Sequence, residues 1–388
     1  MSDPARSSRP DFRQDINGLR AWAVVAVVLY HFGVPGVQGG FVGVDVFFVI
    51  SGFLMTGIIV NSLERSSGGG KSFSLLNFYL ARARRIVPAL AVLCAVLLVL
   101  GWFVMPATDY RQLGIHVVSA LAFVSNIKFW REAGYFDAAS HDKWLLHTWS
   151  LSVEWQFYLI LPLALMLLWR LWPGRRAITG WLLAGFVASL VLSIVVTPLR
   201  PTPVFYLLPT RAWEMLAGGL VFMLADRLPL GAMWRRVIEL AGFALILSAI
   251  ALFEPGSPWP GWRATVPVVG AVLVLVAARQ GSIWTGARVA QWLGNASYSI
   301  YLWHWPVVVC LAYAELLDEP SAVLAGLLAS LLLGYVSYRW VEQPSRQRLT
   351  VWSWKLNVAA LAGITGMVAV GIPLYTSQIP PVWRAYRM

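Results

Sequence analysis

Two ionisable residues on the first apolar segment give the strongest chemical signal in this chain. Arg20 and His31 lie within segment 16–31, which is otherwise mostly aliphatic. Eleven helical steps of about 100° return to nearly the same azimuth, so both side chains share one helix face, about 16 Å apart along the axis. Ionisable residues in a membrane segment usually face a bundle interior or a wet cavity. The pair predicts a route from one membrane surface to a proton-handling imidazole.

A carboxylate follows His31 after a short glycine-rich turn. Asp45 ends the sequence GGFVGVD (39–45), where the second apolar segment begins. A carboxylate beside an imidazole fixes its tautomer and raises its basicity, so we expect Asp45 to orient His31. The alternative is that Asp45 caps its helix near the membrane surface.

Three arginines precede the third apolar segment, in the sequence RARRIVP (82–88). Basic residues in short loops are typical of the cytoplasmic ends of membrane segments, which is one interpretation. The other is that Arg82 and Arg85 hold the phosphates of a nucleotide-bearing donor, because guanidinium groups bind phosphate through paired hydrogen bonds.

Other polar residues lie inside apolar segments. Glu154 follows the sequence TWSLSV (148–153), where it is either part of a capping box or a site residue. His304 lies near the middle of an apolar segment and is either a core histidine or a second site residue. Arg211 and Glu214 are three residues apart, a spacing that predicts an ion pair on one helix face.

The composition is that of a polytopic integral membrane protein. Of the 388 residues, 59% are hydrophobic and 12% are charged, whereas about a quarter of the residues in soluble domains are charged. The net charge of +12 comes from basic residues in short loops between apolar runs, so it indicates topology and not nucleic-acid binding. Cys94 and Cys310 lie in apolar runs without metal-ligand spacing, and we expect no metal site.

Apolar runs long enough to cross a bilayer recur along the chain. They predict an all-α transmembrane helical bundle of about ten core spans plus one additional C-terminal span. The predicted spans are 18–33, 41–61, 86–105, 152–172, 180–197, 204–225, 236–253, 263–280, 295–315, 321–341 and 355–376.

Loop charge predicts how these spans are oriented. If 112–130 does not cross, the basic loops all fall in the cytoplasm and the acidic turn 315–319 falls outside. We therefore expect 1–17 to be a cytoplasmic tail, 18–348 to be the transmembrane domain, and 349–388 to hold an additional helix and the start of an extracytoplasmic linker.

With these residues in place, the chain resembles the acyltransferase 3 family of bacterial membrane O-acyltransferases, which acylate surface glycans. The resemblance extends in order over residues 15–348 and rests on six short motifs. They are R-x10-H (20–31), GGFVGVD (39–45), FFVISGFL (47–54), R-x-x-RI-x-P (82–88), WSLSVE (149–154) and YSIYLWH (298–304).

The resemblance implies roles for several residues. His31 would be the essential catalytic histidine, and Arg82 and Arg85 would engage an acyl-CoA, usually acetyl-CoA, from the cytoplasm. The acceptor would be a sugar hydroxyl across the bacterial inner membrane. The span 355–376 resembles the extra helix that leads to an SGNH-type domain in fused members. Because the Gly-Asp-Ser signature of that domain is absent, we expect a truncated chain.

These inferences predict a path for the acyl donor. The phosphates of acetyl-CoA would lie near Arg82 and Arg85, and the pantetheine arm would pass Arg20 to bring the thioester to His31. The roughly 16 Å between Arg20 and His31 suits an extended pantetheine. Both direct transfer and an acyl-histidine intermediate are open, because a neutral imidazole can act as base or nucleophile.

The remaining site residues are assigned by role. The predicted catalytic residues are His31, Asp45 and Glu154. The predicted acceptor-binding residues are Trp149, Ser150, Tyr301 and His304. Peptidoglycan, the O-antigen of lipopolysaccharide, another surface polysaccharide and a small secreted metabolite are all open as acceptors.

Two other functions are compatible with parts of the sequence. A proton-coupled transporter would use the same buried ionisable groups as a relay, but it would not cleave a thioester. A non-catalytic membrane anchor for an outer domain would leave His31 without a role.

Overall fold

The computed structural model describes residues 12–133, 142–225, 228–348, 363 and 366. Within these ranges every regular element is a helix, which confirms the all-α class. The elements are α1 (Gln14–His31), η1 (Gly40–Val42), α2 (Gly43–Ser67), α3 (Leu75–Val104), α4 (Ala107–Leu121), α5 (Ser125–Glu132), α6 (Thr148–Leu171), α7 (Arg175–Val196), α8 (Pro201–Tyr206), α9 (Leu208–Leu224), α10 (Ala232–Leu252), α11 (Thr265–Ala277), α12 (Arg288–Tyr313), α13 (Pro320–Ser337), η4 (Tyr338–Glu342) and α14 (Gln343–Arg348).

Among the described residues, five helical segments are long and apolar enough to cross a membrane: Gly40–Ser67, Leu75–Val104, Thr148–Leu171, Arg175–Val196 and Pro320–Gln347. A membrane helical bundle fits this finding, while the count of eleven crossings stays a prediction. The last predicted span, 355–376, lies outside the described residues except at positions 363 and 366.

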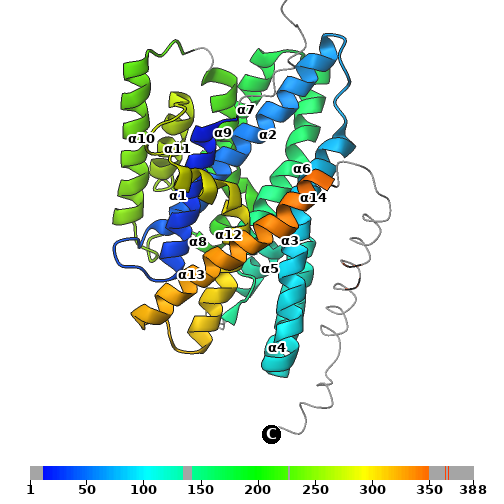
Figure 1. Ribbon diagram of the computed structural model, residues 1–388. Helices are drawn as coiled ribbons and strands as arrows, with labels where there is room; N and C mark the ends of the chain where they lie inside the picture. The colour runs from blue at the N-terminus through cyan, green and yellow to red at the C-terminus, as the bar shows by residue number, and fades with distance from the viewer. Residues whose placement is uncertain (1–11, 134–141, 226–227, 349–362, 364–365, 367–388) are drawn as a thin grey trace, which may run out of the picture.

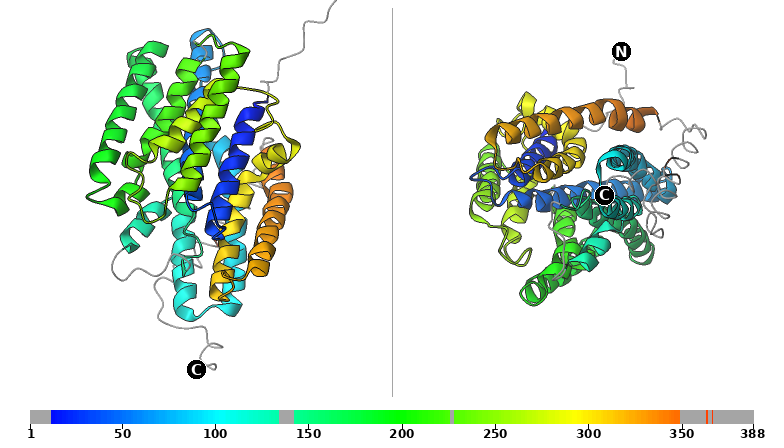
Figure 2. Two further views of the ribbon diagram at one scale, coloured as in Figure 1. Left: turned by 90° about the vertical axis from the view of Figure 1, so that its left-hand side faces the viewer. Right: turned by 90° about the horizontal axis from the view of Figure 1, so that it is seen from below.

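Helix α1 lies in the middle of the bundle. It packs against α2 and α12, with the α10–α11 pair on one side and the α12–α13 pair on the other (Figures 1 and 2). Residues of α1 and α12 therefore line the same part of the bundle interior.

Glycines let α2 approach both of its neighbours at backbone distance. A Cβ atom at Gly43 would lie 2.3 Å from the carbonyl oxygen of Ala23 in α1, and one at Gly52 would lie 1.7 Å from that of Met215 in α9. Small residues at such crossings are the usual means of close helix packing in membranes. The first half of α2 is therefore held at backbone distance between the middle of α1 and the middle of α9.

The segment between α3 and α6 begins and ends toward the same end of the bundle. Trp169, near the end of α6, donates to Ser67 at 3.0 Å, so α6 finishes where α2 finishes and α3 begins. The 15 residues of α4 rise only about 22 Å, which is less than the hydrocarbon thickness of about 30 Å. This geometry fits the prediction that 112–130 does not cross.

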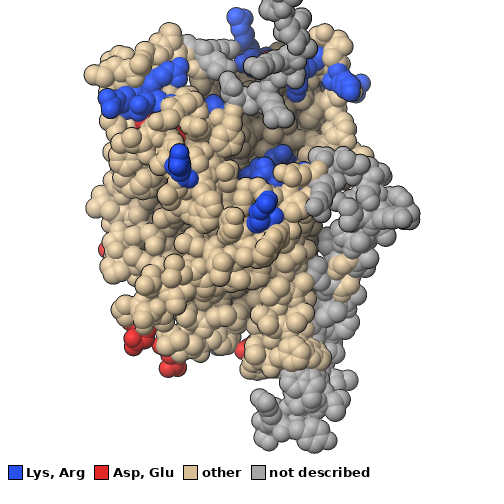
Figure 3. All heavy atoms as spheres, viewed as in Figure 1, with Lys and Arg blue, Asp and Glu red and all other residues tan. Residues whose placement is uncertain are grey.

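Charge distinguishes the two ends of the bundle. Lys and Arg gather at the end where α2 finishes, and Asp and Glu appear at the opposite end, where a turn joins α12 to α13 (Figures 1 and 3). We call the first the basic end, formed by loops 68–74, 172–174 and 278–287. The second is the acidic end, which includes loops 253–264 and 314–319.

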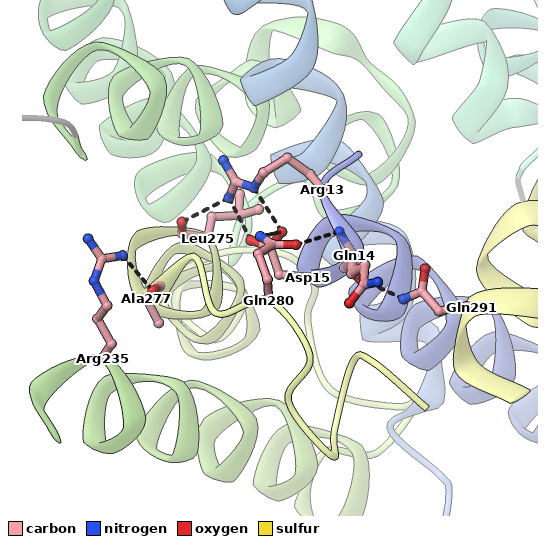
Figure 4. A network of polar contacts seen from close by, with 8 residues as sticks. All are labelled: Arg13, Gln14, Asp15, Arg235, Leu275, Ala277, Gln280 and Gln291. Atoms are coloured by element: carbon pink, nitrogen blue, oxygen red, sulfur yellow. Dashed lines mark hydrogen bonds and ion pairs between the residues drawn. The ribbon is translucent and has the colours of Figure 1, made fainter. Parts of the chain in front are cut away.

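A polar network anchors α1 at the basic end (Figure 4). Arg13 binds the Asp15 carboxylate through two nitrogens at 2.8 and 2.5 Å, and Gln280 donates to the same carboxylate at 2.8 Å. Gln291, in α12, donates to the backbone carbonyl of Gln14 at 2.8 Å. The network fixes the register of α1 against α12 and hence the position of Arg20.

Candidate active site

His31 ends α1 and lies against His304, which comes from the middle of α12. Nδ1 of His31 is 2.9 Å from Nε2 of His304, and the two rings stack with their centroids 5.1 Å apart. Trp305 packs edge-on against the His31 ring at 4.8 Å. Of the two interpretations of His304, this geometry favours a second site residue.

The hydrogen bonds around His304 indicate which ring nitrogens carry protons. Nδ1 of His304 is 2.6 Å from the backbone carbonyl oxygen of Tyr301, and a carbonyl can only accept. Nδ1 therefore donates, and Nε2 of a neutral His304 accepts from Nδ1 of His31. Nε2 of a neutral His31 is then unprotonated and can act as a base or a nucleophile.

Tyr301 is held in place beside this pair. Its hydroxyl donates to the backbone carbonyl of His147 at 2.7 Å and lies 2.7 Å from Oγ of Ser150. Two of the predicted acceptor-binding residues, Ser150 and Tyr301, are thus joined across α6 and α12.

His147 is a candidate that the sequence analysis missed. Its ring is buried, with its centroid 5.8 Å from that of His304. The sequence could have indicated His147 through its position, because it directly precedes the segment 148–154, which carries several predicted site residues.

His31 lines a cavity of about 890 Å³ toward the acidic end, which we call the outer cavity. The loop 253–259 and α8 contribute to its wall, and Trp149, one of the predicted acceptor-binding residues, also lines it. Much of the wall is aromatic, formed by Tyr30, Phe41, Trp149, Phe205, Trp259 and Trp305.

Arg20, Arg82 and Arg85 line one small cavity of about 70 Å³, which we call the waist cavity. Arg20 donates to Ser297 at 2.8 Å, and its guanidinium lies 5.8 Å from the centre of the Phe47 ring. Nε of Arg82 is buried without a hydrogen-bond partner in the described part of the chain. The three arginines predicted to bind the donor therefore converge from α1 and α3.

Glu154 also lines the waist cavity and lies with these arginines. Its carboxylate accepts hydrogen bonds from the hydroxyl groups of Ser51 and Tyr158, which are themselves 3.1 Å apart. No hydrogen bond between described residues joins Glu154 to His31, and its side chain lies with the arginines of the waist cavity.

A third cavity of about 990 Å³ lies at the basic end, and we call it the basic-end cavity. Several arginines line it: Arg13, Arg20, Arg65, Arg85 and Arg346. It shares Arg20, Leu54 and Arg85 with the waist cavity, which in turn shares Val44 and Tyr301 with the outer cavity. The three cavities therefore adjoin in series from the basic end to His31.

The structure corrects the role predicted for Asp45. Its carboxylate lies 3.1 Å from Arg211 and accepts from Trp259 at 3.3 Å, and no hydrogen bond between described residues joins it to His31. Arg211 also forms the predicted pair with Glu214, at 3.0 Å. Within the described part of the chain, the His31 ring is hydrogen-bonded to His304.

Helical periodicity explains this difference. The α2 face that packs on α9 carries Asp45, Val49, Gly52 and Thr56. The face that lines the waist cavity carries Val44, Phe47, Ser51 and Leu54. One residue step turns a helix by about 100°. Asp45 therefore faces α9, although it directly follows Val44, which lines the waist cavity.

Comparison with known proteins gives a family match and three informative relatives. A family model described as an acyltransferase domain matches residues 13–376. Peptidoglycan O-acetyltransferase OatA of Listeria monocytogenes is 29% identical over 368 residues, which cover 89% of this chain and 58% of that protein. The putative membrane-bound transacylase BcsY of Komagataeibacter xylinus is 34% identical over 343 residues, covering 85% of this chain and 82% of that protein.

The putative peptidoglycan O-acetyltransferase YrhL of Bacillus subtilis is 29% identical over 354 residues, covering 85% of this chain and 54% of that protein. This chain thus spans little more than half the length of OatA and YrhL. No solved structure matches it.

Proposed function

The chain belongs to the acyltransferase 3 family, and on this premise we propose that it transfers an acetyl group from cytoplasmic acetyl-CoA to a hydroxyl of an extracytoplasmic glycan. The observation that carries the proposal is the series of three cavities, with arginines at its basic end and His31 at its far end. The relatives named as O-acetyltransferases support acetyl as the group transferred.

The donor enters from the basic end. The arginines of the basic-end cavity fit the phosphates of coenzyme A, because guanidinium groups bind phosphate oxygens through paired, charge-assisted hydrogen bonds. The pantetheine arm extends through the waist cavity past Arg20 and Glu154. Arg20 and His31 lie on one continuous helix, about 16 Å apart along its axis, so the thioester reaches the imidazole.

The acceptor occupies the outer cavity, which lies within the volume range of small-molecule sites, about 300–1,000 Å³. Nε2 of His31 removes the hydroxyl proton or carries the acyl group in transit. In both routes the new ester C–O bond replaces the thioester C–S bond, and the hydroxyl proton ends on the thiol of free coenzyme A. His31 lies at the C-terminus of α1, where the helix dipole stabilises a positively charged imidazolium.

A proton-coupled transporter would use the same buried groups without breaking a covalent bond. Purified full-length protein, supplied with acetyl-CoA and envelope glycans, distinguishes the two functions. We expect stoichiometric release of free coenzyme A together with alkali-labile acetyl ester on the glycan. Tight acetyl-CoA binding without thioester cleavage would contradict the enzymatic proposal.

We expect removal of Arg82 and Arg85 to weaken donor binding. A hydrogen bond to a charged group contributes about 1.5–3 kcal/mol, so the double alanine variant should bind acetyl-CoA at least about tenfold more weakly. Its affinity should also depend less on salt than that of the wild type, because fewer ionic contacts remain to be screened. Calorimetry on the detergent-solubilised protein measures both effects.

Arg84→Ala is the matched control, since Arg84 belongs to the same basic motif but lines none of the three cavities. It should leave donor affinity and its salt dependence unchanged. Equal affinities in the wild type and in the Arg82→Ala/Arg85→Ala variant would contradict donor binding by these arginines. They would then only help to orient the protein in the membrane, as basic residues at cytoplasmic ends do.

The proposal also requires the basic end to face the cytoplasm. In a Cys310→Ala background, Ser321→Cys should react with an impermeant thiol reagent on intact cells, because Ser321 is exposed at the acidic end. Ser72→Cys, exposed in the loop before α3, should react only after permeabilisation. The reverse labelling pattern would place the donor site outside and reject the proposed route.

A further inference from the structure

The wall of the basic-end cavity combines an apolar patch with several arginines. The patch comes from α2 and α9 and carries Phe53, Leu54, Ile58 and Phe222. The cavity volume of about 990 Å³ is in the range of small-molecule sites, about 300–1,000 Å³. An aromatic base that carries phosphate groups next to it, as the adenosine end of coenzyme A does, fits such a wall.

The arginines of this wall differ in how far their charge is neutralised. Two of them pair with carboxylates, Arg13 with Asp15 at 2.5 Å and Arg346 with Glu342 at 3.6 Å. The others form no ion pair with a carboxylate of the described residues: Arg20, Arg65 and Arg85. The cavity therefore offers uncompensated positive charge to an anionic ligand.

One face of α2 follows the cavity from the waist outward. Its residues recur at helical spacing: Leu54, Gly57, Ile58, Asn61, Glu64 and Arg65. Leu54 also lines the waist cavity. Arg65 is eleven residues further along the helix, so it lies about 16 Å from Leu54 along the axis. Glu64 pairs with Arg175 at 2.6 Å and does not neutralise Arg65.

The side chain of Arg65 is held in place on this face. Helical side chains lean toward the N-terminus of their helix, which for α2 is the direction of the waist. Nε of Arg65 donates to the backbone carbonyl of Asn61 at 3.1 Å, and Nη2 donates to the Ser62 hydroxyl at 3.2 Å. A guanidinium has five N–H groups, so others are left to bind a phosphate.

The order of groups in coenzyme A distinguishes Arg65 from the other two uncompensated arginines. Arg20 and Arg85 line both the waist cavity and the basic-end cavity, whereas Arg65 lines only the latter. In coenzyme A the pantetheine arm is joined to the pyrophosphate, and the ribose with its 3′-phosphate follows. With the arm in the waist, the pyrophosphate lies near Arg20 and Arg85 and the 3′-phosphate lies farther out.

We propose that Arg65 binds the 3′-phosphate of the donor, so that the protein selects coenzyme A over its 3′-dephospho form. This inference rests on the proposed function. It goes beyond that function by assigning a separate phosphate subsite to the outer end of the basic-end cavity, distinct from the arginines that reach the waist.

Calorimetry on the detergent-solubilised full chain compares coenzyme A with 3′-dephospho-coenzyme A. Since hydrogen bonds to charged groups are strong, the wild type should bind coenzyme A at least about tenfold more tightly. Arg65→Ala should lose most of this preference through weaker binding of coenzyme A. Arg65→Lys should keep part of it, because lysine retains the charge but not the paired N–H groups. Both variants should bind the dephospho form like the wild type, which also shows that they are folded.

Arg176→Ala is the matched control for a general loss of positive charge. Arg176 is exposed at the start of α7, at the basic end, and lines none of the three cavities. Its preference should equal that of the wild type. Equal wild-type affinities for the two ligands, or an undiminished preference in Arg65→Ala, would overturn the subsite. Failure of the wild type to bind either ligand would instead contradict the donor in the proposed function.

Discussion

His31→Ala is expected to reduce acyl transfer to background, a loss of at least about 10²–10⁴-fold. The variant lacks the unprotonated nitrogen that accepts the hydroxyl proton or carries the acyl group. Binding of acetyl-CoA should persist, because the arginines of the basic-end cavity come from other positions than His31, and Arg20, which is among them, lies about 16 Å from His31 along α1. Labelled acetyl-CoA supplied to inside-out vesicles measures transfer, and calorimetry on the purified variant measures binding.

His116→Gln is the histidine control for this experiment. His116 is a buried histidine of α4 that pairs with Glu132 at 3.1 Å and lines none of the three cavities. Glutamine keeps a hydrogen-bonding group there, so transfer should remain close to that of the wild type. Near wild-type transfer by His31→Ala would reject His31 as the reacting group and direct attention to His304 and His147.

The sequence predicts best what lies along a single helix. Arg20 and His31 share one face because helical periodicity is local, and in the structure they line two adjoining cavities, the waist cavity and the outer cavity. Arg82 and Arg85 reach the same waist cavity for the same reason, since they are three residues apart on α3.

Contacts between helices were harder to predict, because they depend on packing that no local pattern specifies. Asp45 follows His31 closely in sequence, but the glycine contacts between α2 and α9 turn its side chain toward Arg211. Among the described residues, His304 of α12, 273 positions away, is hydrogen-bonded to His31 instead. Only the packing of α1 against α12 brings His304 to this position.

Hydropathy located the apolar segments but not their interruptions. The predicted span 204–225 is divided into α8 and α9, because Leu207 is extended and Pro209 lies in the first turn of α9. Proline disfavours helical geometry in the residue before it and is well accommodated at a helix start. The break places α8 at the wall of the outer cavity, so a departure from regular structure builds part of the site.

His304→Ala is expected to lower the rate of transfer by about 10²–10⁴-fold while leaving the KM for acetyl-CoA nearly unchanged. In the wild type, His304 donates to the Tyr301 carbonyl and accepts from Nδ1 of His31, which keeps Nε2 of His31 unprotonated. Alanine removes the acceptor, so the His31 proton can occupy either nitrogen and the ring can turn. His304 is thus a positioning residue, comparable in effect to the group that fixes the histidine tautomer in hydrolase triads.

A purely structural role for His304 makes a different prediction, and two amide variants separate the cases. The side-chain oxygen of glutamine can reach the place of Nε2 and accept from His31, whereas asparagine is one methylene shorter and its amide falls nearer the place of Nδ1. His304→Gln should therefore recover a substantial part of the lost kcat, and His304→Asn should resemble His304→Ala. Equal activity of the two amide variants, with all three folding normally, would contradict the positioning role, because packing does not require an acceptor at the place of Nε2.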